Sequence, residues 1–153
     1  MCRQTCLYIS LPINDSETNK MQTLTKTQKI EEIESIINYS TGTENYYKYP
    51  LPFGRALLLT DGVKLLAETA GCYWLLDVIA SYQYLKKLDP SFQVWTLEVY
   101  DETTAKKEKC AAVVRGCNDT ELIVKQKIAF TDFPLEKLKL YLMDGVILLP
   151  AEY

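Results

Sequence analysis

The spacing of apolar residues predicts a helix in the first third of the chain. In the segment TLTKTQKIEEIESIINYSTG, isoleucines recur every three or four residues, as on one face of a helix. These are Ile30, Ile33, Ile36 and Ile37. Thr25 or Thr27 can cap the start, and Gly42 stands where a helix commonly ends. Residues 1–22 are mostly polar, so we expect a loosely ordered arm there, followed by one domain over residues 23–153.

Two more helices are predicted downstream. In RALLLTDGVKLLAETAG a short extended run precedes a helix that Thr60 can cap, with Asp61 in the first turn, where the helix dipole favours a negative charge. The next segment, CYWLLDVIASYQYLKKLD, is apolar almost all the way round, which is typical of a buried helix. We therefore expect Cys72–Leu88 to form the central helix, stopped by Pro90.

The second half of the chain changes to a period of two. FQVWTLEVYD alternates like a strand, and TTAKKEKCAAVVRG and TELIVKQKIAFTD predict two more strands joined by the turn-forming cluster GCND. The lysine run Lys106–Lys109 is interpreted as a solvated turn. In KLKLYLMDGVILLP, Asp144 and Gly145 predict a hairpin, with a short helix over Pro134–Leu142 as the alternative. This order predicts an α+β domain: N-terminal helices and one central buried helix packed on a C-terminal antiparallel meander of three to five strands.

A tyrosine-rich segment, TGTENYYKYP, separates the first two helices. The stretch PLPFG closes it, and Pro50 and Pro52 favour extended geometry in the residues before them, so we expect a rigid connector. Alternate residues of an extended chain point opposite ways. Tyr47 and Tyr49 should therefore share one face and Tyr46 and Lys48 the other, with one pair inside and one outside.

Composition narrows the possible functions. The 153 residues contain no histidine, which excludes serine and cysteine hydrolases that use an imidazole, HExxH metalloproteases and zinc deaminases. A net charge of −3 argues against tight duplex binding. Neither a signal peptide nor a run of about 20 apolar residues is visible, so we expect a cytoplasmic protein without membrane contact.

The five cysteines, expected to be reduced thiols, are Cys2, Cys6, Cys72, Cys110 and Cys117. Their spacing matches no zinc motif, and no metal or cofactor is expected.

Carboxylates are the remaining candidates for chemistry. Asp77 lies among apolar residues, so it is either an acid or base tuned by burial, or a structural carboxylate at an exposed edge or bonded to a tyrosine or a backbone amide. Glu68 with Asp77, or Asp61 with Glu44, could pair around magnesium. No DxD motif or glycine-rich phosphate loop accompanies them, so this signal is weak.

The tyrosine segment has three interpretations. With Lys48 and Arg55, its rings could stack on the bases of a single strand. They could also anchor a protein partner, because tyrosine and arginine are enriched at interface hot spots. Alternatively, two of the rings cover the apolar helix and keep their hydroxyls in water.

Four motifs resemble a family of small uncharacterised proteins from cyanobacteria, other bacteria, plasmids and phages. They are TGTENYY, TDGVKLLAETAGCYWLLDVIASYQ, FQVWTL and DGVILLPAEY, and the resemblance covers residues 28–153. It implies a bacterial or mobile-element origin and brings no reaction, cofactor or catalytic residue. Family members tend to carry basic or imidazole-bearing residues after the paired tyrosines, where this chain has KYPLP, so the resemblance gives no support for catalysis at that loop.

The sequence thus favours a non-catalytic protein that docks on another macromolecule, for example an inhibitor of a bacterial defence system. A single-strand nucleic-acid binder and a carboxylate-dependent enzyme are the alternatives. The expected binding residues are Tyr46, Tyr47, Lys48, Tyr49, Arg55, Tyr73, Trp74 and Asp77. The apolar C-terminal hairpin could leave an edge strand that pairs with a second copy, so both a monomer and a homodimer are open.

Overall fold

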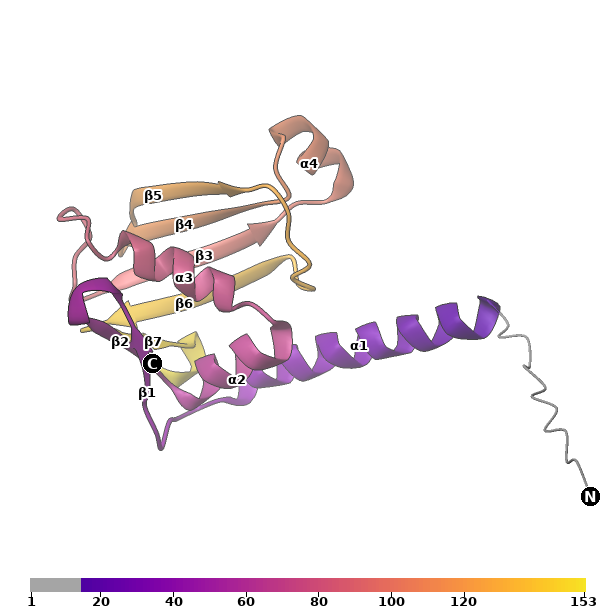
Figure 1. Cartoon of the computed structure of the whole chain (residues 1–153), viewed down its shortest axis with the longest axis horizontal. Coiled ribbons are helices and arrows are strands. Elements are labelled where there is room, and N and C mark those ends of the chain that lie inside the picture. Colours follow the sequence, from indigo (N-terminus) through magenta and orange to yellow (C-terminus); the bar gives the residue numbers. More distant parts are fainter. Residues whose placement is uncertain (1–14) are drawn as a thin grey trace, which may run out of the picture.

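A seven-stranded mixed sheet forms the centre of the computed structural model, which describes the backbone of residues 15–153 and the side chains of residues 25–153 apart from Phe53 (Figure 1). The strand order is β1-β2-β7-β6-β3-β4-β5. The strands are β1 (Tyr47–Pro50), β2 (Ala56–Leu59), β3 (Gln93–Val99), β4 (Ala112–Asn118), β5 (Glu121–Ile128), β6 (Lys137–Met143) and β7 (Val146–Leu148). Neighbours run antiparallel except β2 and β7, which are parallel. The α+β class is confirmed, with more strands than expected because β1 and β2 extend the sheet.

The first helix is longer than the sequence pattern predicted. Helix α1 (Asp15–Tyr39) begins within the segment expected to be an arm, and residues 1–14 of that arm lie outside the described residues. Ile33 and Ile36 are buried where α1 packs against α2 (Asp61–Ala70), whereas the amino-terminal part of α1 extends beyond the sheet (Figure 1). Helix α2 starts at the predicted Thr60 cap and ends at Gly71, which adopts a positive φ of 68°.

The central helix is shorter than expected and buries one side. Helix α3 (Tyr73–Tyr82) ends six residues before Leu88. Its buried residues are Leu75, Leu76, Ile79 and Ala80, which face the sheet, whereas Tyr73 and Asp77 are exposed. Apolar composition alone did not reveal this, because the exposed face carries a large aromatic ring as well as polar groups.

A buried polar network joins the end of α3 to β3. The Trp95 indole N–H donates to the Gln93 side-chain oxygen at 2.9 Å. The amides of Gln83 and Gln93 exchange hydrogen bonds of 3.0 and 3.1 Å. Across the strand, the Trp95 ring lies against Gly116, where a Cβ atom would approach it to 2.7 Å. Residue 116 therefore has to be glycine for the ring to fit.

A short helix replaces one predicted segment in the second half. Helix α4 (Glu102–Glu108) covers residues expected to be a strand and a turn, so β4 starts only at Ala112. Asp101 caps α4 by accepting the Thr104 N–H at 3.0 Å, and Lys109 ends it with a positive φ of 55°. A seven-residue helix is too short to give a clear period.

Both predicted hairpins are confirmed. The turn between β4 and β5 contains Asp119 with a positive φ of 52°, and Asp144 and Gly145 have φ values of 48° and 84°. Two consecutive positive φ values are the requirement of the tight turn that joins β6 to β7. The alternative helix over Pro134–Leu142 is wrong, because β6 occupies most of that range.

The terminal hairpin offers no free strand edge. β7 pairs with β6 on one side and β2 on the other, so the basis for dimerisation through this hairpin is removed. The edges of the described sheet are β1 and β5. Among the described helices, none combines the length and apolar character needed to cross a membrane. The chain ends in a short 3-10 helix, η2 (Pro150–Glu152), and another, η1 (Pro52–Gly54), joins β1 to β2.

Candidate functional site

The tyrosine segment forms the edge strand β1, and its residues alternate as the sequence predicted. Tyr47 and Tyr49 are half-buried on the helix side, whereas Lys48 between them is exposed. Tyr46, directly before the strand, is 58% exposed. The strand therefore presents two ordered rings beside α2 and α3, and its lysine points the other way.

Tyr49 is bonded to Asp77, the carboxylate that the sequence analysis identified as a candidate. Its hydroxyl donates a hydrogen bond to Asp77 Oδ1. Burial raises the pKa of Tyr49, and the bond to Asp77 raises it further. Asp77 is exposed and is bonded to a tyrosine. It therefore fits the structural carboxylate considered in the sequence analysis, and not an acid or base tuned by burial.

Tyr47 is fixed from two sides by α2. The Lys64 ammonium lies 4.2 Å from the centroid of its ring, within range of a cation–π contact. Hydrogen bonding to Asp61 raises the pKa of the Tyr47 hydroxyl. Lys64 also lies 3.5 Å from the Glu68 carboxylate, four residues further along the helix. Sequence reasoning missed Lys64, although the spacing of Asp61, Lys64 and Glu68 places all three on one helix face.

Tyr73 completes the arrangement from α3. Burial raises the pKa of Tyr73, as does the charge of the neighbouring Glu68. We call the combined set the tyrosine–carboxylate surface. It consists of Tyr47, Tyr49, Asp61, Lys64, Glu68, Tyr73 and Asp77, with Tyr46 beside it. With three carboxylates and one ammonium, the surface is acidic, and its tyrosines remain protonated hydrogen-bond donors at neutral pH.

The residues before β1, in the motif TGTENYY, are bonded to the start of α2. The backbone N–H groups of Glu44 and Asn45 donate to Asp61 Oδ2 at 2.8 and 3.0 Å, and the Thr43 hydroxyl donates to it at 3.1 Å. These bonds lower the pKa of Asp61 to about 2. Asp61 and Glu44 therefore meet through a backbone group, and not as a pair of carboxylates.

The chain terminus meets the same helix end, which the sequence did not indicate. Glu152 accepts hydrogen bonds from the Thr60 hydroxyl at 2.6 Å, the Gly62 N–H at 3.2 Å and the Leu149 N–H at 2.9 Å. A Cβ atom on Gly62 would lie 2.8 Å from the Glu152 carboxylate. The parallel pairing of β2 and β7 explains the convergence, because parallel strands end at the same edge. Three of the four motifs thus meet in a structural junction.

The remaining predicted residues do not join the tyrosine–carboxylate surface. Arg55 lies over the ring of Tyr84, 5.6 Å from its centroid, and the Tyr84 hydroxyl donates to the Pro52 carbonyl at 2.6 Å. Trp74 is half-buried and packs against the core. With Lys48 on the opposite face, Lys64 is the one cation of the tyrosine–carboxylate surface, and it already lies against the Glu68 carboxylate and the Tyr47 ring.

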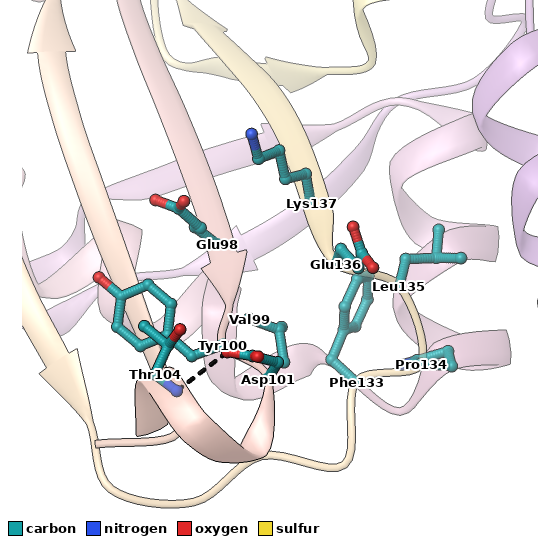
Figure 2. A pocket seen from close by; sticks show the side chains of 10 residues that line it. All are labelled: Glu98, Val99, Tyr100, Asp101, Thr104, Phe133, Pro134, Leu135, Glu136 and Lys137. Atoms are coloured by element: carbon teal, nitrogen blue, oxygen red, sulfur yellow. Dashed lines mark hydrogen bonds between the residues drawn. The ribbon is translucent and has the colours of Figure 1, made fainter. Parts of the chain in front are cut away.

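A separate cavity of about 620 Å³ lies where β3, α4 and the segment before β6 meet (Figure 2). Figure 2 shows Glu98, Asp101 and Glu136 along its wall. Asp101 already caps α4, and Glu98 pairs with Arg115. Among the residues that the structure describes, no group of three or more Cys, Asp or Glu side chains is placed to hold a metal ion.

Comparison with protein-family models matches residues 31–153 to DUF6876, a family of unknown function. The chain belongs to this family. The matched region starts within α1 and contains the whole tyrosine–carboxylate surface. It confirms the resemblance to a family of uncharacterised proteins, whereas the bacterial or mobile-element origin stays a prediction. No curated protein and no solved structure matches the chain.

Proposed function

We propose that this family member is a non-catalytic binding protein that docks a cationic surface of another protein onto the tyrosine–carboxylate surface. The observation that carries the proposal is the gathering of three tyrosines from β1 and α3 beside carboxylates of α2 and α3 on one accessible side. Tyrosine supplies a large rigid contact at low entropic cost and is enriched among hot-spot residues.

The order of these rings in the free protein supports docking. Tyr49 is hydrogen-bonded to Asp77, and Tyr47 lies under Lys64. Side chains that are already fixed lose less conformational freedom when a partner binds. The excess of carboxylates in turn favours a partner rich in lysine or arginine, since complementary charge speeds association and selects partners.

The two alternatives have weaker support at this surface. A nucleic acid would meet three carboxylates there, while Lys48 and Arg55 lie elsewhere. An enzyme built on Asp77 would need a proton-transfer group poised near neutral pH. The tyrosine pKa values instead move away from neutrality, which favours hydrogen bonding over proton transfer.

Retention of partners by immobilised protein tests the proposal. Lysate of the source organism is passed over wild type, Tyr46→Ala and the charge reversal Glu68→Lys. The matched control is Phe130→Ala, because Phe130 is 81% exposed and follows β5, at the opposite sheet edge from β1. We expect a partner that is retained by wild type and the control and lost by both surface variants.

Binding measurements with the purified partner then give the size of the affinity loss in each variant. Removing one hot-spot tyrosine costs about 2 kcal/mol, or about 30-fold in Kd, and affinity should fall with added salt. Equal affinity of wild type, Tyr46→Ala and Glu68→Lys for every retained protein would refute this surface as the contact.

One concrete version of this function is inhibition of a bacterial defence system. Expression in a host that carries such a system should then raise phage plating efficiency, and Tyr46→Ala should abolish the gain. Unchanged plating efficiency with the wild-type protein would refute this version and leave the docking experiment to decide the general proposal.

A further inference from the structure

The sheet has a second accessible face, opposite the helices. Trp95, Leu97, Leu138 and Leu140 point toward the helices and are buried. Figure 1 shows α2 and α3 lying along one face of the sheet. The alternate residues of β3 to β6 point away from these helices, and most of them are exposed or half-buried. We call this side the open face.

Cations line up across the open face. In the sheet register, Lys139 is opposite Thr96, Thr96 is opposite Arg115, and Arg115 is opposite Lys125. This row crosses four strands, or about 14 Å at the usual strand spacing. The next row along contains Lys137, Glu98, Val113 and Lys127. The two rows together hold five cations and one carboxylate, in a chain whose net charge is −3.

Three of these lysines are available to a ligand. Glu98 pairs with Arg115, and Lys127 donates to the Glu108 carbonyl oxygen at 2.8 Å. Lys125, Lys137 and Lys139 are exposed and make no ion pair with any residue that the structure describes. With five cations and one carboxylate, the two rows carry a formal net charge of +4.

An aromatic cluster adjoins the cation row. Tyr141 follows Lys139 by two residues and so lies on the same face of β6. Its ring centroid is 5.3 Å from that of Phe92 and 5.6 Å from that of Tyr153, which is 74% exposed. Aromatic rings beside a positive surface are the combination that binds unpaired bases and their phosphates.

A cavity of about 430 Å³ lies on the sheet surface over β6, β3 and β4, which carry most of the row. Its lining includes Thr96, Glu98, Arg115, Lys137 and Lys139. It shares Glu98 and Lys137 with the larger cavity of Figure 2, which is bordered by Asp101 and Glu136. The surface thus becomes acidic beyond the second row, so a polyanion would cross the first row toward the aromatic cluster.

We propose that the open face binds single-stranded nucleic acid, with Lys125, Lys137 and Lys139 contacting phosphates and the Tyr141–Tyr153 cluster stacking on bases. A duplex fits less well, because its bases are not available to stack on the exposed rings. This site is separate from the tyrosine–carboxylate surface, so either proposal can fail without the other.

Fluorescence polarisation with labelled oligonucleotides tests the site. Single-stranded DNA and RNA of equal length are compared with a duplex at several salt concentrations. We expect binding to at least one single strand, with a log–log salt slope of about −2, from about 0.7 per phosphate contact over three lysines. Absence of binding to both single strands, or equal binding to the duplex, would overturn the proposal.

Variants locate the contact. Lys139→Glu should weaken binding about tenfold and reduce the salt slope by about 0.7, and Lys125→Glu at the other end of the row should do the same. Tyr153→Ala should weaken binding about tenfold by removing a stacking surface. The matched control, Lys26→Glu, makes the same charge change on exposed α1 and should bind like wild type. Equal losses in the control and the Lys139 variant would show non-specific charge attraction and overturn the assignment.

Discussion

The junction at Glu152 gives the sharpest test of how this fold is held together. Its carboxylate accepts hydrogen bonds from Thr60, Gly62 and Leu149, all of which are buried. Glu152→Ala leaves these three donors without their acceptor. A buried donor without a partner costs about 1–3 kcal/mol. Water can reach part of the site, because Glu152 itself is only half-buried. We therefore expect a loss of about 3 kcal/mol in the free energy of unfolding.

Glu152→Gln should cost less for a reason visible in the geometry. Oε2 accepts from both Thr60 and Leu149, whereas Oε1 accepts from Gly62 alone. A glutamine can therefore place its carbonyl oxygen at the Oε2 position and lose only the Gly62 bond. We expect about 1–2 kcal/mol for this variant.

Urea unfolding and calorimetry measure both effects. For a domain of this size, 1 kcal/mol corresponds to about 2–4 °C in Tm, so Glu152→Ala should lower Tm by about 6–12 °C. The control is Glu31→Ala on the exposed side of α1, which should stay within about 0.5 kcal/mol of wild type. If Glu152→Ala were as stable as the control, the junction would not contribute to stability and the reasoning would be wrong.

Three further predictions concern stability. The pKa of Asp61 falls from 3.8 to about 2 on folding, so the carboxylate stabilises the fold above pH 4 and loses this effect as the pH falls to 2. Asp61→Asn should weaken the pH dependence of the unfolding free energy, measured by chemical denaturation. Gly116→Ala would place a Cβ atom 2.7 Å from the Trp95 ring and should cost about 1–3 kcal/mol, with a shifted tryptophan emission spectrum; unchanged emission and stability would contradict this packing. Gln93→Leu removes the acceptor of the buried indole N–H and should cost about 1–3 kcal/mol in urea unfolding, whereas an unchanged midpoint would show that the network is dispensable.

Much of the local structure was predictable because the signals are short-range. The isoleucine spacing gave α1, Thr60 and Gly71 gave the bounds of α2, and Asp144–Gly145 gave the last hairpin. Helix α4 was not predicted, because seven residues with a lysine run show no amphipathic period.

The candidate site was predictable in part. Tyr47, Tyr49, Tyr73 and Asp77 do lie together, and alternation correctly turned Lys48 away from them. Lys64 and the partnership of Tyr49 with Asp77 depend on β1 pairing with β2 at the sheet edge, beside the helices. That pairing is a long-range contact which periodicity does not encode.

The sequence by itself determined where the three apolar-patterned helices lie, the alternating strands, the lack of histidine and the tyrosine alternation, because each follows from residue type and spacing along the chain. Tertiary structure alone decided which distant groups meet. The parallel pairing of β2 with β7 brings Glu152 to the start of α2, and the strand order β6-β3-β4-β5 aligns Lys139, Arg115 and Lys125. Strand order is set by packing of the whole core, so no local pattern carries it.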